Sequence, residues 1–208
     1  MVRLNIHLAV DEQTVQFCRQ VNADIRRIAK SAIVFSDTSP MIPHITLVMG
    51  DFIPSQTFEA LTTVTETLAQ KVKPLTLKLS QPYIEPLKGR FVSYNIQEDP
   101  ALTELRQMMR ENILGTYLTS PYARPRAPHI TLAHIYTRQE KVDSFLKLIN
   151  EIPPVVCSQI EISHVGSMGA CVDRLFALNL AHRDDRELLP QRHRLSFVGM
   201  PGFVGMPT

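Results

Sequence analysis

The chain has 208 residues, of which 44% are hydrophobic and 20% charged, the balance of a globular protein with a sizeable core. Its net charge of +2 at pH 7 is too small to predict a nucleic-acid coat or a membrane-binding surface by charge alone. The N-terminus lacks a continuous apolar stretch, and no apolar run approaches the roughly 20 residues of a membrane helix. We therefore expect a cytoplasmic protein without a signal peptide. The sequence leaves the oligomeric state open, with a monomer favoured.

Periodicity in the first half predicts strands and helices in alternation. Residues 4–10 alternate as a strand, and Asp11 can cap a helix whose apolar residues keep helical spacing up to Ile28. A second helix is expected over residues 54–72 because Pro54 can open it. Strands are expected near 75–79 and over 91–96.

The second half repeats that order. We expect a helix over 99–118, a strand at 128–132, a helix over 138–150, and strands near 155–165 and 174–182. The mixed order of strands and helices predicts an α+β fold with antiparallel sheets. The tail, residues 183–208, is polar and then rich in Gly and Pro, and we expect it to be irregular.

Two internal repeats indicate a duplication. The segment Pro-His-Ile-Thr-Leu occurs at residues 43–47 and again at 128–132, an offset of 129 − 44 = 85. The segment at 90–96 is echoed at 174–180, an offset of 174 − 90 = 84. Two matches at nearly one offset predict two interleaved half-repeats of about 85 residues within a single domain, residues 1–182. The expected arrangement is bilobal and pseudo-twofold, with sheets lining a central cleft and helices outside.

The repeated segment carries groups suited to phosphodiester chemistry. In a strand, residues i and i+2 share a face, so His44 emerges beside Thr46, and His129 beside Thr131. An imidazole, with a usual pKa near 6.5, acts as acid or base near neutral pH. Hydroxyl groups can donate hydrogen bonds to the non-bridging oxygens of a phosphate. This scheme requires neither a metal nor another cofactor.

These residue types also allow other interpretations. A single His on a strand is usually structural, and His7, His164 and His182 are expected to be so. A zinc site is disfavoured because two His occur without a companion carboxylate motif such as HExxH. The three cysteines, Cys18, Cys157 and Cys171, are scattered and predict core or surface thiols, with neither a disulfide framework nor a thiolate zinc site.

The paired segments resemble the two His-x-Thr motifs of the 2H phosphoesterase superfamily, which includes LigT-like RNA 2′-5′ ligases and 2′,3′-cyclic phosphodiesterases. The resemblance covers roughly residues 2–182. It implies a bilobal α+β fold with a central cleft, catalytic roles for His44 and His129, and phosphate binding by Thr46 and Thr131. Which His is the acid and which the base depends on the direction of the reaction.

One position departs from the superfamily. Many LigT-like members carry Arg where this chain has His134, and some plant relatives carry an aromatic residue. An imidazole there can stack on a base or contact phosphate, but less strongly than the fork of an Arg side chain. The alternative is a surface residue at the end of a strand.

Four more residues are candidate substrate contacts. Arg124 and Arg126 precede the second motif and either bind phosphate or form a solvated loop. Tyr83 and Tyr122 can stack a nucleobase, whereas Tyr94 is expected in the core because its strand is apolar.

These features predict a hydrolase of the 2H phosphoesterase type that acts on 2′,3′-cyclic phosphate ends of RNA or on small cyclic nucleotides. The alternatives are an RNA 2′-5′ ligase or 2′-5′ phosphodiesterase, a non-catalytic module that binds RNA or a nucleotide, and a scaffold with a vestigial cleft. ATP-driven ligation is not expected, because the chain contains no GxxxxGK[ST] motif. The expected partners are RNA ends or small nucleotides, with no membrane and no metal.

Overall fold

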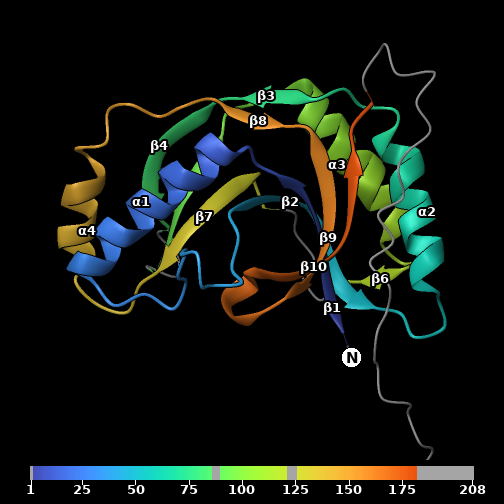
Figure 1. Ribbon diagram of the computed structural model, residues 1–208, viewed down its shortest axis with the longest axis horizontal. Coiled ribbons are helices and arrows are strands. Elements are labelled where there is room, and N and C mark those ends of the chain that lie inside the picture. The colour runs from blue at the N-terminus through green and yellow to red at the C-terminus, as the bar shows by residue number, and fades with distance from the viewer. Residues whose placement is uncertain (1, 86–89, 121–125, 182–208) are drawn as a thin grey trace, which may run out of the picture.

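Two antiparallel sheets form the two lobes of the computed structural model, which describes residues 2–85, 90–120 and 126–181 (Figure 1). The larger sheet contains, in spatial order, β10 (Cys171–Asn179), β9 (Gln159–Val165), β1 (Arg3–Ala9), β2 (His44–Phe52) and β6 (Leu118–Thr119). The smaller sheet contains β4 (Leu79–Ile84), β5 (Phe91–Ile96) and β7 (His129–His134). A short ladder of β3 (Leu75–Leu77) and β8 (Val155–Cys157) runs between the lobes. The predicted α+β class is confirmed.

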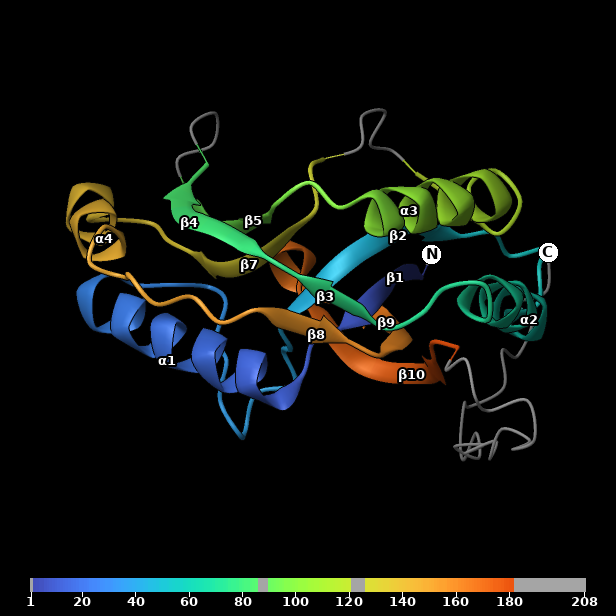
Figure 2. The ribbon, with the colours of Figure 1, turned by 90° about the horizontal axis from the view of Figure 1, so that it is seen from above.

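Each lobe is covered by two helices taken from both halves of the sequence. The helices are α1 (Glu12–Ile28), α2 (Phe58–Ala69), α3 (Pro100–Ile113) and α4 (Gln139–Leu146), with a short 3₁₀ turn, η1 (Ser167–Gly169). Figure 2 shows α1 and α4 together beside the smaller sheet, where they contact β7 and β4. Helices α2 and α3 cover the larger sheet and contact β10 and β2. Thus α1 precedes β2 in the chain but packs on β7, and α3 precedes β7 but packs on β2.

Helices α1 and α3, each of which packs on the lobe opposite to that of the motif strand following it, begin at equivalent aspartate caps. The carboxylate of Asp11 accepts the backbone N–H of Thr14 at 2.9 Å, as the sequence predicts, and also that of Val156 in β8 at 2.6 Å. Asp99 accepts the backbone N–H of Leu102 at 2.8 Å at the start of α3. Each cap satisfies an otherwise unpaired N–H group of its helix, and Asp11 also ties α1 to the ladder between the lobes.

Several predicted boundaries are wrong, for local reasons. The helix expected over 54–72 begins at Phe58, because the side chain of Thr57 accepts the N–H of Ala60 while Pro54 lies in a turn. The helix expected over 99–118 ends at Ile113, and Gly115 follows with φ of 84°, a conformation that favours glycine. The expected strand at 155–165 is divided into β8 and β9, and the separate strand β4 was not expected.

The second internal echo is equivalent in chain order but not in position. Strand β5 follows and pairs with β4, as β10 follows and pairs with β9. However, β5 lies between β4 and β7, whereas the corresponding place between β9 and β2 is filled by β1. Arg90 and Arg174, the first residues of the two echoed segments, therefore do not lie at equivalent positions.

In each of the two larger sheets one face is apolar and buried, and the opposite face carries a His-x-Thr motif. In β2, Ile45 and Leu47 are fully buried, as alternation predicts. Tyr94 and all three cysteines are also buried, in agreement with the sequence. No helix in the described ranges is long and apolar enough to cross a bilayer.

A buried asparagine of α1 holds the strand that carries the second motif. Asn22 donates from its amide to the carbonyl oxygens of Leu132 in β7, at 2.8 Å, and of Ile33, at 3.0 Å. Its own oxygen accepts the N–H of Phe35 at 3.1 Å. Three backbone groups distant in sequence thus depend on one side chain.

Replacing Asn22 by Ala should therefore destabilise the fold strongly. Unpaired buried polar groups cost about 1–3 kcal/mol each, so we expect a loss of roughly 3 kcal/mol, measured by chemical denaturation. Asn112→Ala is the control, because this exposed amide only donates to Met108 within its own helix, and it should change stability by less than about 0.5 kcal/mol. A similar small change in both variants would contradict this role for Asn22.

Candidate active site

A β-bulge recurs at the same place in both motif strands. His7 lies opposite Thr46 but Ile6 lies opposite Val48, so Leu47 is the extra residue in β2. In the same way Ser93 lies opposite Thr131 and Val92 opposite Ala133, so Leu132 is the extra residue in β7 (132 − 47 = 85). Bulges of this kind redirect the side chains that follow them and are frequent beside active sites.

The bulge decides which face His134 occupies. Simple alternation from His129 would place His134 on the opposite face of the strand. With the bulge, His134 lies opposite Phe91, while Thr131 lies opposite Ser93 in the same alternation of β5. His134 therefore shares the face of the His-x-Thr motif, and its counterpart in β2 is Met49 (134 − 85 = 49).

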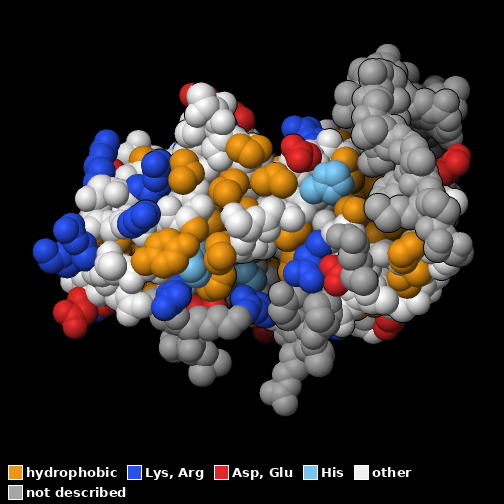
Figure 3. Space-filling view, turned by 90° about the horizontal axis from the view of Figure 1, so that it is seen from below, with side chains coloured by type: hydrophobic (Ala, Val, Ile, Leu, Met, Phe, Trp, Pro, Cys, Tyr) orange, Lys and Arg blue, Asp and Glu red, His pale blue; other side chains and the backbone are white. Residues whose placement is uncertain are grey.

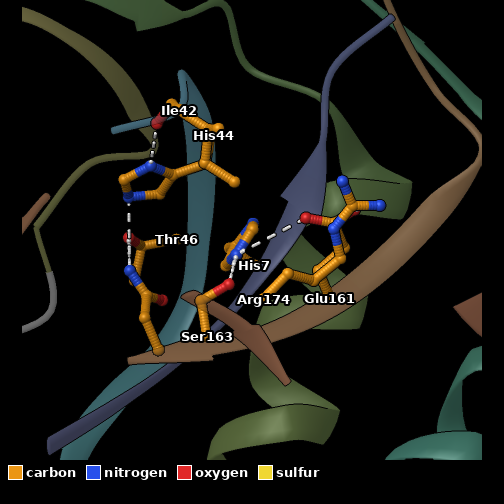
Figure 4. A network of polar contacts seen from close by, with 8 residues as sticks. His7, Ile42, His44, Thr46, Glu161, Ser163 and Arg174 are labelled. Atoms are coloured by element: carbon orange, nitrogen blue, oxygen red, sulfur yellow. Dashed lines mark hydrogen bonds and ion pairs between the residues drawn. The ribbon is translucent and has the colours of Figure 1, made fainter. Parts of the chain in front are cut away.

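His44 is oriented by two hydrogen bonds (Figure 4). Its Nδ1 lies 2.9 Å from the carbonyl oxygen of Ile42, two residues earlier, so this nitrogen carries the proton and donates it. Its Nε2 lies 3.2 Å from Nδ2 of Asn5 and accepts from that amide in the neutral ring. The amide also donates to Oγ1 of Thr46 at 2.9 Å. Since that oxygen accepts from Asn5, the Thr46 hydroxyl hydrogen is left to point elsewhere, as a phosphate-binding donor must.

His129 is held in the same way on the other lobe. Its Nδ1 lies 2.8 Å from the carbonyl oxygen of Ala127, again two residues earlier. In both motifs the residue before the histidine is a proline, and Nε2 is the nitrogen left to exchange protons. Strands β2 and β7 contact each other, so the two motifs meet where the lobes join.

The surroundings of both imidazoles favour the neutral form and lower the two pKa values. Burial lowers the pKa of His44 to about 4 and outweighs the bond to Ile42, which raises it, while the charge of His129 lowers it as well. Burial also lowers the pKa of His129, assisted by the charges of Arg126 and Arg106. An electrostatic effect of His129 on His44 agrees with the two rings being close neighbours.

Buried polar side chains lie behind the ring of His44. The ring of His7 lies 5.0 Å from that of His44, and its Nε2 is 3.0 Å from Oγ of Ser163 (Figure 4). Glu161 is nearly buried and pairs with Arg174 at 3.1 Å, while its other oxygen is 3.9 Å from His7. Burial and the charge of His44 keep the pKa of His7 well below its usual value. His7 thus has a structural place, as expected, but directly behind the candidate site.

The candidate contacts on the His129 side form a second cluster. The hydroxyl of Tyr83 donates to Oδ1 of Asn95 at 3.0 Å, and Asn95 lies opposite His129 in the strand pairing. Arg126 pairs with Glu85 at 3.8 Å. Both Tyr83 and Arg126 therefore lie beside the second motif, whereas Tyr122 and Arg124 lie outside the described residues.

Arg106 of α3 is a residue that the sequence did not single out. Its Nη2 donates to the carbonyl oxygen of Arg126 at 2.7 Å, and its buried Nε has no hydrogen-bond partner among the described residues. Its charge also reaches His129. No local motif marks it, because its proximity to the site arises only from the packing of a distant helix.

The fold and the paired motifs agree with comparisons to known proteins. Residues 17–167 match the family model described as the 2′-5′ RNA ligase superfamily, and the chain belongs to that superfamily. This confirms the resemblance to the 2H phosphoesterases. No sequence among the curated proteins matches the chain.

Solved structures share the fold at low sequence identity. The crystal structure of TT0787 from Thermus thermophilus has a TM-score of 0.60 and 19% identity, covering 86% of this chain and 97% of that one. Escherichia coli LigT complexed with 3′-AMP has a TM-score of 0.56 and 18% identity, covering 87% and 99%. Kluyveromyces marxianus Usb1 has a TM-score of 0.51 and 12% identity, covering 86% and 97%.

The contacts of Asn5 predict a graded effect on His44. Asn5→Leu removes the donor that stabilises the neutral ring, so the pKa of His44 should rise by about one, equivalent to a hydrogen bond worth roughly 1 kcal/mol. Asn5→Asp should raise it more, because a carboxylate favours the imidazolium. The measurement is an NMR titration of the histidines. Asn179→Leu, an exposed change in the same sheet, is the control, and an unchanged pKa in both Asn5 variants would contradict the assignment.

Proposed function

We propose that this protein opens 2′,3′-cyclic phosphate ends of RNA, or small cyclic nucleotides, by acid–base catalysis through His44 and His129. The supporting observation is the repeated arrangement of the two rings, each with Nδ1 donating to the carbonyl oxygen two residues earlier. This fixes the ring so that Nε2 is the nitrogen that exchanges protons, and at His44 the substrate would replace the Asn5 amide as the partner of that nitrogen. Membership of the 2′-5′ RNA ligase superfamily supports phosphodiester chemistry on RNA ends.

The electrostatics favour His44 as the base in hydrolysis. With a pKa of about 4 it is neutral at neutral pH, so its Nε2 can take a proton from the attacking water as the new P–O bond forms. His129 then donates a proton to the ribose oxygen as the P–O bond of the ring breaks. Although burial lowers the pKa of His129, a bound phosphate anion opposes that effect by favouring the imidazolium. In the reverse direction the roles exchange.

The threonines complete the proposed site. Thr46 and Thr131 occupy equivalent positions on the two motif strands and can donate to the non-bridging oxygens. The LigT structure complexed with 3′-AMP is that of a protein of this fold with a nucleotide whose phosphate is on the 3′ oxygen of the ribose. The same chemistry would fit the product of ring opening here.

Ligation is the second candidate function. The family is described by RNA ligation, and the same ring opening with a different nucleophile would join two RNA ends. Such a ligase would use the ring energy of the cyclic phosphate and the 5′-hydroxyl of a second RNA in place of water. Incubation of the two RNA ends, with the linkage identified by nuclease digestion, separates ligation from hydrolysis.

Substitution of either histidine should abolish turnover. We expect His44→Ala and His129→Ala each to lower kcat by at least about 100-fold, the usual contribution of one general acid or base, while excess chelator leaves the wild-type rate within about twofold. The assay uses the four nucleoside 2′,3′-cyclic monophosphates and a short RNA with a cyclic end. His164→Ala is the control, because this ring lies on β9, where it faces Asp173 of the edge strand β10 and not the paired motifs. Turnover that persists in both site variants would refute the proposal.

The dependence on pH follows from the two lowered pKa values. As pH rises through about 4, His44 loses its proton and becomes a base, so kcat/KM should increase. As pH rises toward 6.5, the free enzyme loses the proton of His129, whose pKa lies below that value, and kcat/KM should fall again. The profile of kcat/KM should therefore be bell-shaped with its maximum below pH 6.5. A maximum above about pH 7.5 would contradict these assignments.

Threonine substitutions test phosphate binding separately from proton transfer. Thr46→Val and Thr131→Val keep the shape of the side chain but remove its donor, so we expect each to lower kcat/KM by about 10- to 100-fold. The bell shape of the pH profile should remain, because both histidines are intact. Loss of the acidic limb in Thr46→Val would instead show that this hydroxyl acts mainly on His44.

A further inference from the structure

A basic hollow lies where the end of α1 meets the start of α4. It has a volume of about 540 Å³, and its lining includes Arg26, Arg27, Lys30 and Arg138, with no carboxylate side chain among the described residues. Figure 3 shows Lys and Arg side chains gathered at the left end of this face, where both helices lie. All four cations are exposed.

Helix electrostatics explain only part of this cluster. Arg26 and Arg27 occupy the last turn of α1, where cations complement the helix dipole, and Arg27 pairs with Asp24 at 2.6 Å. Lys30 and Arg138 lie outside that helix. Arg138 has φ of 58° and donates to the carbonyl oxygen of Ile28, the last residue of α1, at 3.0 Å, so its cation caps the end of that helix at the rim of the hollow.

Aromatic side chains connect the hollow to the second motif. Tyr136 is 46% exposed, and its ring lies 5.1 Å from that of His134, which in turn lies 4.6 Å from Phe91. The backbone N–H of Tyr136 donates to the carbonyl oxygen of Lys30 at 3.3 Å. Because His134 shares the face of Thr131, these rings lead from the candidate site directly to the basic hollow.

We propose that Tyr136 and the basic hollow together bind the RNA strand on the 5′ side of the reacting end, with phosphates in the hollow and a base on Tyr136. Aromatic rings interleaved with cations are the usual means of holding single-stranded nucleic acid. His134 is only 6% exposed, and burial and the charge of Arg90 lower its pKa, so its ring supports Tyr136 from behind while the exposed ring of Tyr136 takes the base. The inference rests on the proposed function and names its substrate: an oligonucleotide.

The dimensions fit more than one nucleotide. At about 3.3 Å per residue, β7 separates His129 from His134 by roughly 15 Å. A mononucleotide at the paired histidines therefore does not reach the hollow, whereas the preceding nucleotides of a strand do. The two substrate classes should respond differently when the hollow is altered.

The test compares adenosine 2′,3′-cyclic monophosphate with a single-stranded RNA hexamer ending in a 2′,3′-cyclic phosphate. For Arg26→Glu/Lys30→Glu we expect kcat/KM on the hexamer to fall at least about tenfold, mainly through KM, while the mononucleotide changes less than about twofold. Tyr136→Ala should act in the same direction. Lys71→Glu/Lys73→Glu is the charge-matched control, because both lysines are exposed beyond the end of α2 on the other lobe, and it should leave both substrates unaffected.

The hollow variant must also weaken the salt dependence of the hexamer reaction, since fewer phosphate contacts release fewer counterions. Equal losses on both substrates, or a hexamer rate that is unchanged, would overturn the inference. If the wild type turns over neither substrate, the proposed function fails, and binding of a hexamer ending in a 3′-phosphate, followed by fluorescence anisotropy, decides the inference. A roughly tenfold weaker Kd in the hollow variant would then support it, and an unchanged Kd would overturn it.

Discussion

The β-bulge shared by β2 and β7 is the constraint on which the geometry of the candidate site depends. Each bulge follows a His-x-Thr pair and places two consecutive apolar residues, Leu47-Val48 or Leu132-Ala133, in the core. The next side chain then returns to the polar face. Without this extra residue, β7 would turn His134 into the core side of the sheet and break the aromatic connection to Tyr136.

Support for the two histidines differs between the lobes. Behind His44 lie the buried side chains of Asn5 and His7, with Ser163 and Glu161 beneath them. Burying so many polar groups is costly unless they bond to one another, and here they largely do. Beside His129 lie tyrosine, asparagine and arginine side chains nearer to solvent. Duplication thus supplied two equal imidazoles, and their unequal surroundings make one of them the stronger candidate base.

The solved relatives share the backbone fold of this chain but few of its side chains. At 12–19% identity, similar backbones show that paired strands and crossing helices are retained. The residues that would select a substrate are properties of this chain: His134 on the motif face, Tyr136 beside it, and the cations at the end of α1 and the start of α4. They extend from the second motif along one lobe, where the proposed oligonucleotide would lie.

Sequence alone determined the α+β class and the duplication and identified the four candidate motif residues, because strand alternation and a repeated five-residue segment are local patterns. It also identified Tyr83 and Arg126 as candidates, but could not show their proximity to His129. Only the tertiary structure revealed Asn5, His7 and Arg106 beside the motifs, since strand pairing and helix crossing bring together residues up to 156 positions apart. The face of His134 was likewise undecided, because a one-residue bulge reverses the alternation on which every sequence-based assignment of a strand face depends.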